Sequence, residues 1–422
     1  TMNTTRDGTN ATVSQRDRVI LRDLARRKAE LARDPVNLER VRGWYALDSG
    51  GPCRPMILAE TGGVAETMFP PSTLRCEGEV ARNLESQLRR ELHQFDVLKD
   101  DRVLEPLIRC GWRIDFGAYG VQATMHRADN DGQLGARNWE PALKDFPRDL
   151  DRLKPRVFRV DRKASLADKA HLEEIFDGIL SVTMNGCLWW TMGMTWTAIE
   201  LIGLEKLMLA MYDAPDGLHR LMAFLRDDHL AMAAWAEAEG LFTLNNGNDY
   251  TGSGSIGFSR ALPQPDYRPG MAVRTRDLWV LLESQETVGV GPDLFKEFIL
   301  PYQVAVAARF GRLYYGCCEP VHTRWDAVRS LPNLARVSVS PWCDQDFMAG
   351  ALGRARVFSR KPNPTLVSTA VFDEEAIRAD LDTTVRAARG CRLEIIMKDV
   401  HTVRNDPSRL PRWGAQPADR LG

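Results

Sequence analysis

Side chains that can do chemistry collect directly after three apolar runs of the sequence. They are Glu283 in LWVLLE, Cys317, Cys318 and Glu319 in RLYYGCCE, and Asp399 and His401 in LEIIMKDVHTV. Thiolate, carboxylate and imidazole groups are the protein ligands of zinc. Residues two apart on a strand face the same way, so Cys317 and Glu319 are expected to point inward together, as are Asp399 and His401. The pattern predicts a catalytic metal site.

Each of these residues also has a structural interpretation. A lone cysteine is usually a small buried apolar residue, a histidine near a strand end is often only hydrogen-bonded, and Glu283 can simply pair with an arginine. The spacing matches neither a CxxC ligand pair nor an H-E-x-x-H motif. The metal hypothesis therefore depends on the three groups meeting at one place.

Two further segments are candidates for binding a substrate. The stretch GNDYTGSGSIGFS contains Asp249 and Tyr250 and is expected to be a substrate-facing loop, with a plain flexible loop as the alternative. Trp189 and Trp190 belong to a Met- and Trp-rich segment that either packs in the core or lines a pocket for an aromatic ring. The sequence has no G-x-S-x-G elbow and no Walker loop.

The elements that must position these residues alternate between strands and helices. Strands are expected at 180–184, 241–245, 278–283, 313–317, 335–339, 357–359 and 393–398, and helices at 293–310, 346–352 and 373–389. Parallel strands need crossover connections, and no G-x-G-x-x-G motif directly follows any of these strands. The sequence therefore predicts an α/β fold, a (β/α)8 TIM barrel over 151–422, whose chemistry lies at the C-terminal ends of its strands.

The residues before the barrel are expected to form a separate unit. We expect a disordered tail at 1–16 and an N-terminal α+β extension at 17–150, with a helix at 17–33 that Ser14 opens and a short strand at 53–60. The helix at 17–33 carries arginine and leucine side chains, which suggests a subunit contact. A homodimer is the expected oligomer.

Composition excludes several classes of protein. The chain has 56 Lys and Arg against 57 Asp and Glu, so no basic excess indicates a nucleic-acid or membrane-surface partner. Eight cysteines in 422 residues are too few for a disulfide scaffold. The 22 uncharged residues from Gly178 to Ile199 include Asn185 and several hydroxyl side chains, so they are expected to be core rather than a membrane span. The first residues lack the apolar stretch of a secretory signal, and we expect a soluble, cytoplasmic enzyme.

Two longer stretches resemble a known family. SQETVGVGPDLFKEFILPY and the later KDVHTVRNDP are similar to the uroporphyrinogen decarboxylase superfamily, and the likeness covers about residues 180–415. The decarboxylases carry an arginine-rich FMRQAGR motif in their first barrel strand. The corresponding stretch here, RPMILAETGG, lacks that pattern. The chain therefore most resembles the methyltransferase branch, whose zinc proteins pass a methyl group to the Co(I) of a corrinoid protein.

The resemblance implies roles for the residues singled out above. In that branch zinc is bound by a His-x-Cys pair and a distant cysteine. Here Cys317, Cys318 and Glu319 stand at the first position and His401 stands near the second. Glu283 and Asp399 are the implied catalytic residues, Trp189, Trp190, Asp249 and Tyr250 the implied substrate contacts, and an aryl methyl ether the implied methyl donor.

Two other functions remain open at this stage. One is a metal-free, decarboxylase-like enzyme that acts on a carboxylated substrate. The other is a non-catalytic protein that binds a corrinoid.

Overall fold

The computed structural model describes residues 13–127 and 137–421, so most of the expected tail lies outside the described residues. The strands are β1 (Met56–Ala59), β2 (Leu107–Gly111), β3 (Ile114–Asp115), β4 (Thr124–Arg127), β5 (Arg137–Glu140), β6 (Arg159–Val160), β7 (Ser181–Asn185), β8 (Tyr250–Gly252), β9 (Ser255–Ile256), β10 (Trp279–Leu282), β11 (Arg312–Tyr315), β12 (Leu334–Val339), β13 (Val357–Arg360) and β14 (Arg392–Met397). The helices of the first half are α1 (Gln15–Leu31), α2 (Pro35–Ser49), α3 (Ala65–Met68), α4 (Glu79–His93), α5 (Arg162–Phe176), α6 (Thr195–Ile202), α7 (Leu204–Asp213) and α8 (Pro215–Ala238). Those of the second half are α9 (Pro292–Phe298), α10 (Leu300–Ala307), α11 (Trp325–Val328), α12 (Gln345–Leu352), α13 (Thr365–Ser368), α14 (Glu374–Ala387) and α15 (Arg409–Leu421).

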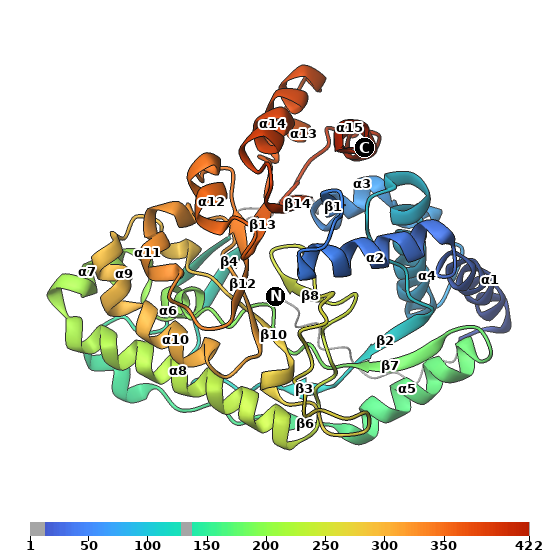
Figure 1. Cartoon of the computed structure of the whole chain (residues 1–422). Coiled ribbons are helices and arrows are strands. Elements are labelled where there is room, and N and C mark those ends of the chain that lie inside the picture. The colour runs from blue at the N-terminus through green and yellow to red at the C-terminus, as the bar shows by residue number, and fades with distance from the viewer. Residues whose placement is uncertain (1–12, 128–136, 422) are drawn as a thin grey trace.

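A six-stranded parallel sheet forms the centre of the molecule (Figure 1). Its order is β1-β14-β13-β12-β11-β10, and β2 and β7 form a separate parallel pair. Met56 of β1 stands beside Glu394 of β14, so the sheet takes one edge strand from the segment expected to be a separate extension. The α/β class is confirmed. A closed eight-stranded barrel is not, because among the described residues β1 and β10 are the edges of this sheet.

One expected strand is not formed. Residues 241–245 make no strand ladder, so that part of the strand prediction is wrong. Instead the Asn245 side chain accepts a hydrogen bond from Trp279 N (2.9 Å) and donates one to Trp279 O (3.1 Å). A side-chain amide thus satisfies the backbone groups at the free edge of β10, where a neighbouring strand would normally do so.

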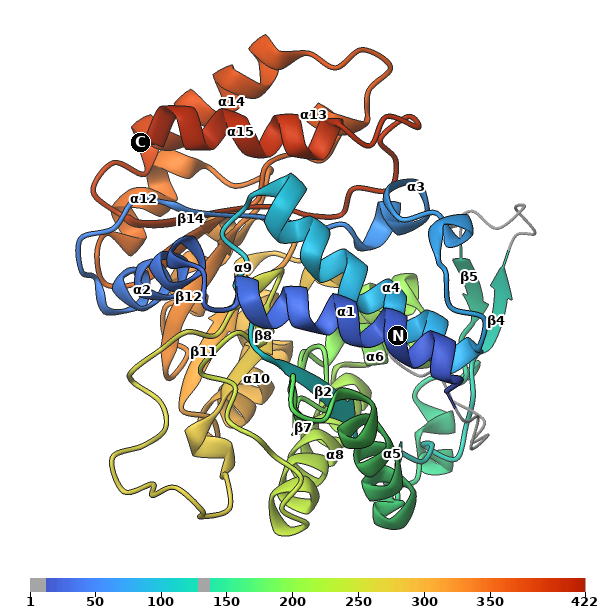
Figure 2. The same cartoon turned by 90° about the vertical axis from the view of Figure 1, so that its right-hand side faces the viewer.

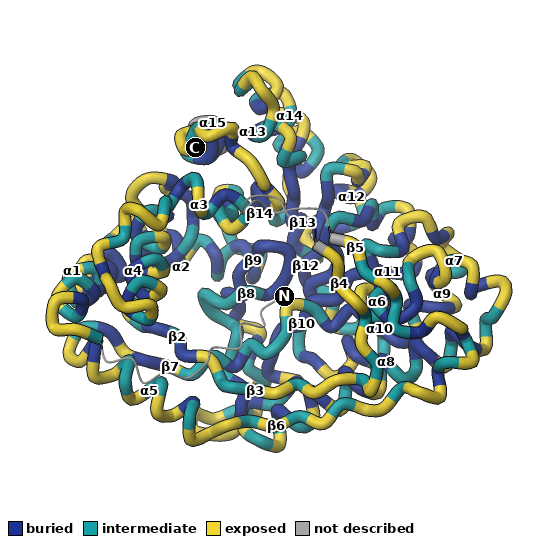
Figure 3. The backbone as a smooth tube through the Cα atoms, turned by 180° about the vertical axis from the view of Figure 1, so that it is seen from behind, coloured by how far each residue is buried: buried dark blue, intermediate teal, exposed yellow. Residues whose placement is uncertain are grey.

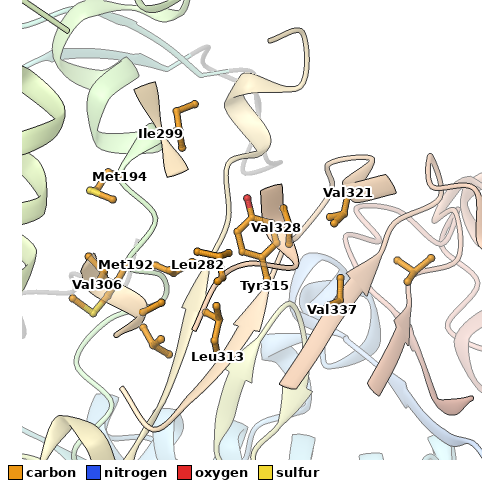
Figure 4. Packing of buried hydrophobic residues seen from close by; sticks show 14 of the residues in the cluster. Met192, Met194, Leu282, Ile299, Val306, Leu313, Tyr315, Val321, Val328 and Val337 are labelled. Carbon is orange, nitrogen blue, oxygen red and sulfur yellow. The ribbon is translucent and has the colours of Figure 1, made fainter. Parts of the chain in front are cut away.

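Apolar side chains of the strands face outward onto the helices. Figure 4 shows Leu282, Leu313 and Val337 of neighbouring strands packing with Val306 and Val328 of the helices. The strands are accordingly buried and the outer helix faces exposed (Figure 3). This packing explains why the strands read as nearly continuous apolar runs in the sequence.

Helix α1 begins at Gln15, where the Ser14 side chain accepts a hydrogen bond from Asp17 N at 3.0 Å. It lies beside α4 (Figure 2). Leu21 and Ala25 are buried in the cluster that the two helices share, so α4 covers the apolar face of α1 within the chain. The homodimer stays a prediction. No helix in the described part of the chain is long and apolar enough to cross a membrane.

The hairpin β8–β9 lies against the inner face of the sheet (Figure 1). A side-chain carbon at Gly252 would come within 2.5 Å of the Tyr314 ring, so the close approach requires glycine. Arg336 of β12 fixes the hairpin, because its Nη1 donates to Ser255 Oγ (2.6 Å) and Ile256 O (2.9 Å). The same nitrogen lies 3.3 Å from Glu394 Oε2, and both charged side chains are fully buried.

Replacing Arg336 with Met should therefore be strongly destabilising. The variant leaves the Glu394 carboxylate buried without its cation, and breaking such a pair costs about 3–5 kcal/mol. Urea unfolding followed by circular dichroism measures the free energy of unfolding. Arg329→Met is the control, because its ion pair with Asp326 is exposed, and it should cause no resolvable change. A loss below about 1 kcal/mol for Arg336→Met would contradict this role.

Candidate functional site

A buried ammonium group lies where the strands β11 and β14 end. Lys398 follows β14 directly and is 7% exposed. Its Nζ lies 3.2 Å from Cys317 Sγ, 3.3 Å from Ser253 Oγ and 3.2 Å from Asp399 Oδ2. Burial lowers the pKa of Lys398, but the negative charges of Cys317 and Asp399 outweigh it and raise that pKa above its ordinary value. Lys398 is therefore a fixed positive charge.

Cys317 loses its proton more readily beside this cation. It is 3% exposed, and its Sγ lies 3.6 Å from the Sγ of Cys318. The hydrogen bond from Cys318 and the charge of Lys398 outweigh burial and lower the pKa of Cys317 to about 7. The same hydrogen bond raises the pKa of Cys318, which stays a thiol. The pair therefore gains one negative charge as the pH rises through about 7.

Asp399 completes the group around Lys398. Its φ is +58°, in the left-handed region that Asp tolerates better than most residues. This turn brings Asp399 Oδ2 to 3.6 Å from Cys318 Sγ while it also contacts Lys398. Lys398, Cys317, Cys318, Ser253 and Asp399 are called the thiolate–ammonium cluster below.

Three carboxylates lie close to this cluster. Glu319 is buried, and its two oxygens accept hydrogen bonds from Ser284 N (2.9 Å) and Cys317 N (2.8 Å). Glu283 is also buried, and Gln285 N donates to its Oε2 at 3.1 Å. Burial, and then the charges of Glu286 and Glu319, raise the pKa of Glu283 well above its usual value. Burial and these charges therefore favour the protonated form of Glu283, which can act as a proton donor.

Glu286 is the third of these carboxylates. Thr195 Oγ1 donates to its Oε2 at 2.6 Å. Its Oε1 is buried without a hydrogen-bond partner among the described residues.

The other residues singled out in the sequence lie in different places. His401 is exposed beside Gly63, and no contact joins it to Cys317 or Glu319 in the described part of the chain. Trp189 packs edge-on against Phe242 and Phe310 with ring centroids 5.6 Å apart, which is a core environment. Trp190 is 45% exposed. The roles expected for these side chains stay predictions.

The loop after residue 246 places its two candidate residues differently. Asp249 forms an ion pair with Arg109 (3.1 Å), and burial raises the pKa of Asp249. The Tyr250 hydroxyl accepts a hydrogen bond from Ser253 N at 2.9 Å, next to Lys398. Of these two residues, Tyr250 lines a cavity and Asp249 is not part of that lining. This cavity of about 280 Å³ also has Glu60 and Arg102 in its wall.

The donor atoms, as they lie, do not fit the expected zinc ion. In residues 13–127 and 137–421, no three His, Cys, Asp or Glu side chains are arranged to hold a metal. Both Glu319 oxygens accept backbone hydrogen bonds, and the cation between Cys317 and Asp399 is Lys398. Zinc stays a prediction, and no step below depends on it.

Sequence reasoning missed two charged residues at the same strand ends. Glu60 follows β1, and Lys361 follows β13. Lys361 Nζ donates to Tyr314 Oη (2.9 Å) and Ser359 Oγ (2.5 Å), and burial lowers the pKa of Lys361 to about 7. For Glu60 the signal was available, because it is the first charged position after the apolar strand β1.

The pKa of Cys317 predicts a titration near neutral pH. Because this pKa is lowered to about 7, the thiolate should form as pH rises through 7 and be lost below it. Ultraviolet thiolate absorbance against pH measures the midpoint. Cys317→Ser should remove this step, and Lys398→Met should move it to higher pH because the stabilising cation is gone. Cys391→Ser is the control and should leave the step in place. An unchanged midpoint in Lys398→Met would disprove the pairing.

Metal analysis tests the zinc ligands separately. Because Lys398 Nζ already lies between Cys317 Sγ and Asp399 Oδ2, protein purified without a metal-affinity tag should contain well below one zinc per chain. Elemental analysis of the protein and of the Cys317→Ala and His401→Ala variants provides the measurement. Stoichiometric zinc that both variants lose would restore the ligand set expected from the sequence.

The comparisons with known proteins bear on the fold. No protein-family model matches the chain, and no curated protein matches it. Among solved structures it is similar to a methyltransferase from Methanosarcina mazei, with a TM-score of 0.52 and 12% sequence identity. The match covers 91% of this chain and 99% of that one. At this identity the likeness shows that the two chains share a fold.

Proposed function

We propose that this chain is a methyltransferase that removes a methyl group from a small methylated molecule. The fold likeness to a methyltransferase over 91% of the chain supports this assignment. So does the sequence resemblance over about residues 180–415. The observation that carries the proposal is the buried Lys398 cation at the C-terminal ends of the strands, where α/β enzymes of this kind place their chemistry.

Demethylation requires a departing atom to accept an electron pair. When the bond between the methyl carbon and an ether oxygen breaks, both electrons stay on the oxygen, which becomes negative. A fixed positive charge in a buried site stabilises such developing charge. Lys398 supplies this charge, while Cys317 and Asp399 hold it in place. It thereby takes the electrostatic part that a metal would otherwise play.

Glu283 supplies the proton. Its raised pKa keeps it protonated at neutral pH, so it can give a proton to the departing atom as the carbon bond breaks. The departing group then leaves as a neutral alcohol, phenol or amine, and Glu283 becomes a carboxylate. Glu286 and Glu319 make that carboxylate a strong base, which favours its return to the acid form.

The donor and the acceptor are further parts of the proposal. By its resemblance to the methyltransferase branch, the chain would take an aryl methyl ether and pass the methyl group to the Co(I) of a corrinoid carried by a partner protein. An aryl ether releases a phenolate, and a positive charge with a nearby acid makes a phenolate a better leaving group. The sequence resemblance alone supports this donor and this acceptor.

One observation favours a second candidate. The site holds Lys398 where zinc is expected, and Arg102 in the neighbouring cavity makes no ion pair within the described residues. Two cations without a metal also suit a decarboxylase-like enzyme acting on a carboxylated substrate. Release of carbon dioxide instead of a methyl group would identify it.

A methyl-transfer assay tests the proposed function. Carbon-13 methyl-labelled methoxyphenols, methylamines and betaines are offered with cob(I)alamin, and methylcobalamin is followed by absorbance and NMR. Glu283→Gln keeps the shape but loses the proton, so the rate should fall about 10²- to 10⁴-fold. Lys398→Met should cost about 10²- to 10³-fold. With the intact chain, the rate should also fall as pH rises through the raised pKa of Glu283, because the acid form is lost.

Cys391→Ala is the matched control, because Cys391 lies at the start of β14, away from the strand ends. It should keep the full rate. The proposal is wrong if no donor yields methylcobalamin, or if Glu283→Gln and Lys398→Met both retain full activity.

A further inference from the structure

The cavity of about 280 Å³ beside Tyr250 has a charged lining that the proposed chemistry does not use. It lies between the β8–β9 hairpin and the chain around residues 102–109. Its volume is near the lower end for small-molecule sites, which suits a ligand the size of an amino acid. Six of its lining residues carry a charge, and they are Lys28, Glu60, Glu91, Arg102, Glu105 and Arg109.

Four of these six charges already have partners within the chain. Lys28 Nζ lies 2.5 Å from Glu91 Oε2 and also donates to Leu107 O at 2.7 Å. Arg109 Nη2 lies 2.7 Å from Glu105 Oε2. Arg109 also pairs with Asp249 (3.1 Å), so all four side chains already have partners of opposite charge and shape the wall of the cavity.

The two remaining charges have opposite signs. The Arg102 guanidinium makes no ion pair or side-chain hydrogen bond with any described residue, although its charge lowers the pKa of the buried Asp100. The Glu60 carboxylate also makes no ion pair or hydrogen bond in the described part of the chain. Its charge raises the pKa of both Lys398 and Lys361, so it faces these two cations at longer range.

The Glu60 carboxylate lies close to the backbone of the hairpin. Gly254 has φ +85°, and a side-chain carbon there would come within 2.8 Å of Glu60 Oε1. The carboxylate therefore lies directly over a glycine that also lines the cavity. Any larger residue at 254 would move it.

A buried acceptor adds to the negative side of the cavity. Asn248 donates through Nδ2 to Val103 O at 2.8 Å, but its Oδ1 is buried and accepts no hydrogen bond from the described residues. Tyr250 contributes an aromatic ring to the same lining, and such rings attract cations. An unpaired acceptor of this kind is costly unless a ligand supplies the donor.

We propose that this cavity binds a small zwitterion, with its carboxylate on Arg102 and its ammonium group on Glu60, beside Asn248 Oδ1 and the Tyr250 ring. Such a ligand satisfies every charge that the chain leaves unpaired there. Tyr250 and Glu60 also adjoin the thiolate–ammonium cluster. That the zwitterion is the methyl donor rests on the proposed function. Its binding does not.

Calorimetric titration of the full chain with matched ligands tests the proposal. The probes are glycine, trimethylglycine and 4-(trimethylammonio)butanoate as zwitterions, 3,3-dimethylbutyrate as the anion of the same shape as trimethylglycine, and choline as the cation. At least one zwitterion should bind about 10- to 100-fold more tightly than either singly charged probe. Equal binding of trimethylglycine and 3,3-dimethylbutyrate, or no binding of any zwitterion, would overturn the proposal.

Single substitutions test which residue binds each charged group of the ligand. Arg102→Met should weaken the binding of the zwitterion and of 3,3-dimethylbutyrate about 10-fold or more. Glu60→Gln should weaken the binding of the zwitterion and of choline to a similar degree. The exposed residues Arg33 and Glu66 provide the controls Arg33→Met and Glu66→Gln, which should bind as the parent does. Thermal melting checks that each variant is folded, and Gly254→Ala provides a second way to displace Glu60.

The binding test and the methyl-transfer assay can be contradicted independently of each other. Zwitterion binding without methyl transfer would leave the cavity assignment standing and remove the proposed function. Methyl transfer without zwitterion binding would do the reverse. If Arg102→Met and Glu60→Gln both bind the zwitterion as tightly as the parent chain, the ligand lies elsewhere and the cavity assignment is wrong.

Discussion

The buried contact between Arg336 and Glu394 organises the interior of this protein. Two charges taken out of water are tolerable only when they neutralise each other and their remaining hydrogen-bonding groups find partners. Arg336 meets this need with Ser255 and Ile256 of the hairpin, and Glu394 with Ser255 and Ser359. The hairpin is therefore fixed against the sheet by polar contacts, and it carries Tyr250, Ser253 and Gly254 to the C-terminal ends of the strands.

The same need for neutrality explains the thiolate–ammonium cluster. A lone Lys398 at this depth would lose its proton, and a lone Cys317 would keep its own, because burial disfavours the charged form of each. Together, with Asp399, they stay charged. Burial has the opposite outcome for the carboxyl groups that lie farther from Lys398. Glu283 lies near Glu286 and Glu319 without a close cation, so it stays neutral. One end of the sheet thus holds a positive charge and a proton donor, both of which interact with Cys317.

Sequence patterns predicted most strands of the sheet, because these strands are largely apolar, although β12 and β14 carry the charged residues Arg336 and Glu394. They failed where the chain leaves regular structure. Cys317 and Glu319 were expected to point inward as neighbours on a strand, but β11 ends at Tyr315, and Glu319 turns back to accept hydrogen bonds from Cys317 and Ser284. The expected pairing of Asp399 with His401 failed similarly, because the positive φ of Asp399 breaks the strand alternation. Residues such as Arg102 and Glu60 lie far apart in sequence, and only the fold shows that both remain unpaired beside one cavity.

The cavity and the cluster are linked through the charge of Glu60. Lys398 is surrounded by negative groups, and Glu60 is one of those that raise its pKa. Each of them weakens the positive field that Lys398 can offer to a departing anion, because fields from opposite charges partly cancel. An ammonium group bound on Glu60 removes one of these contributions without touching Cys317 or Asp399. When the cavity is filled, the negative charge of Glu60 would cancel less of the positive field that Lys398 exerts on the departing atom than when the cavity is empty. A zwitterion in the cavity would accordingly do more than occupy space, because it would strengthen the charge on which the proposed chemistry depends.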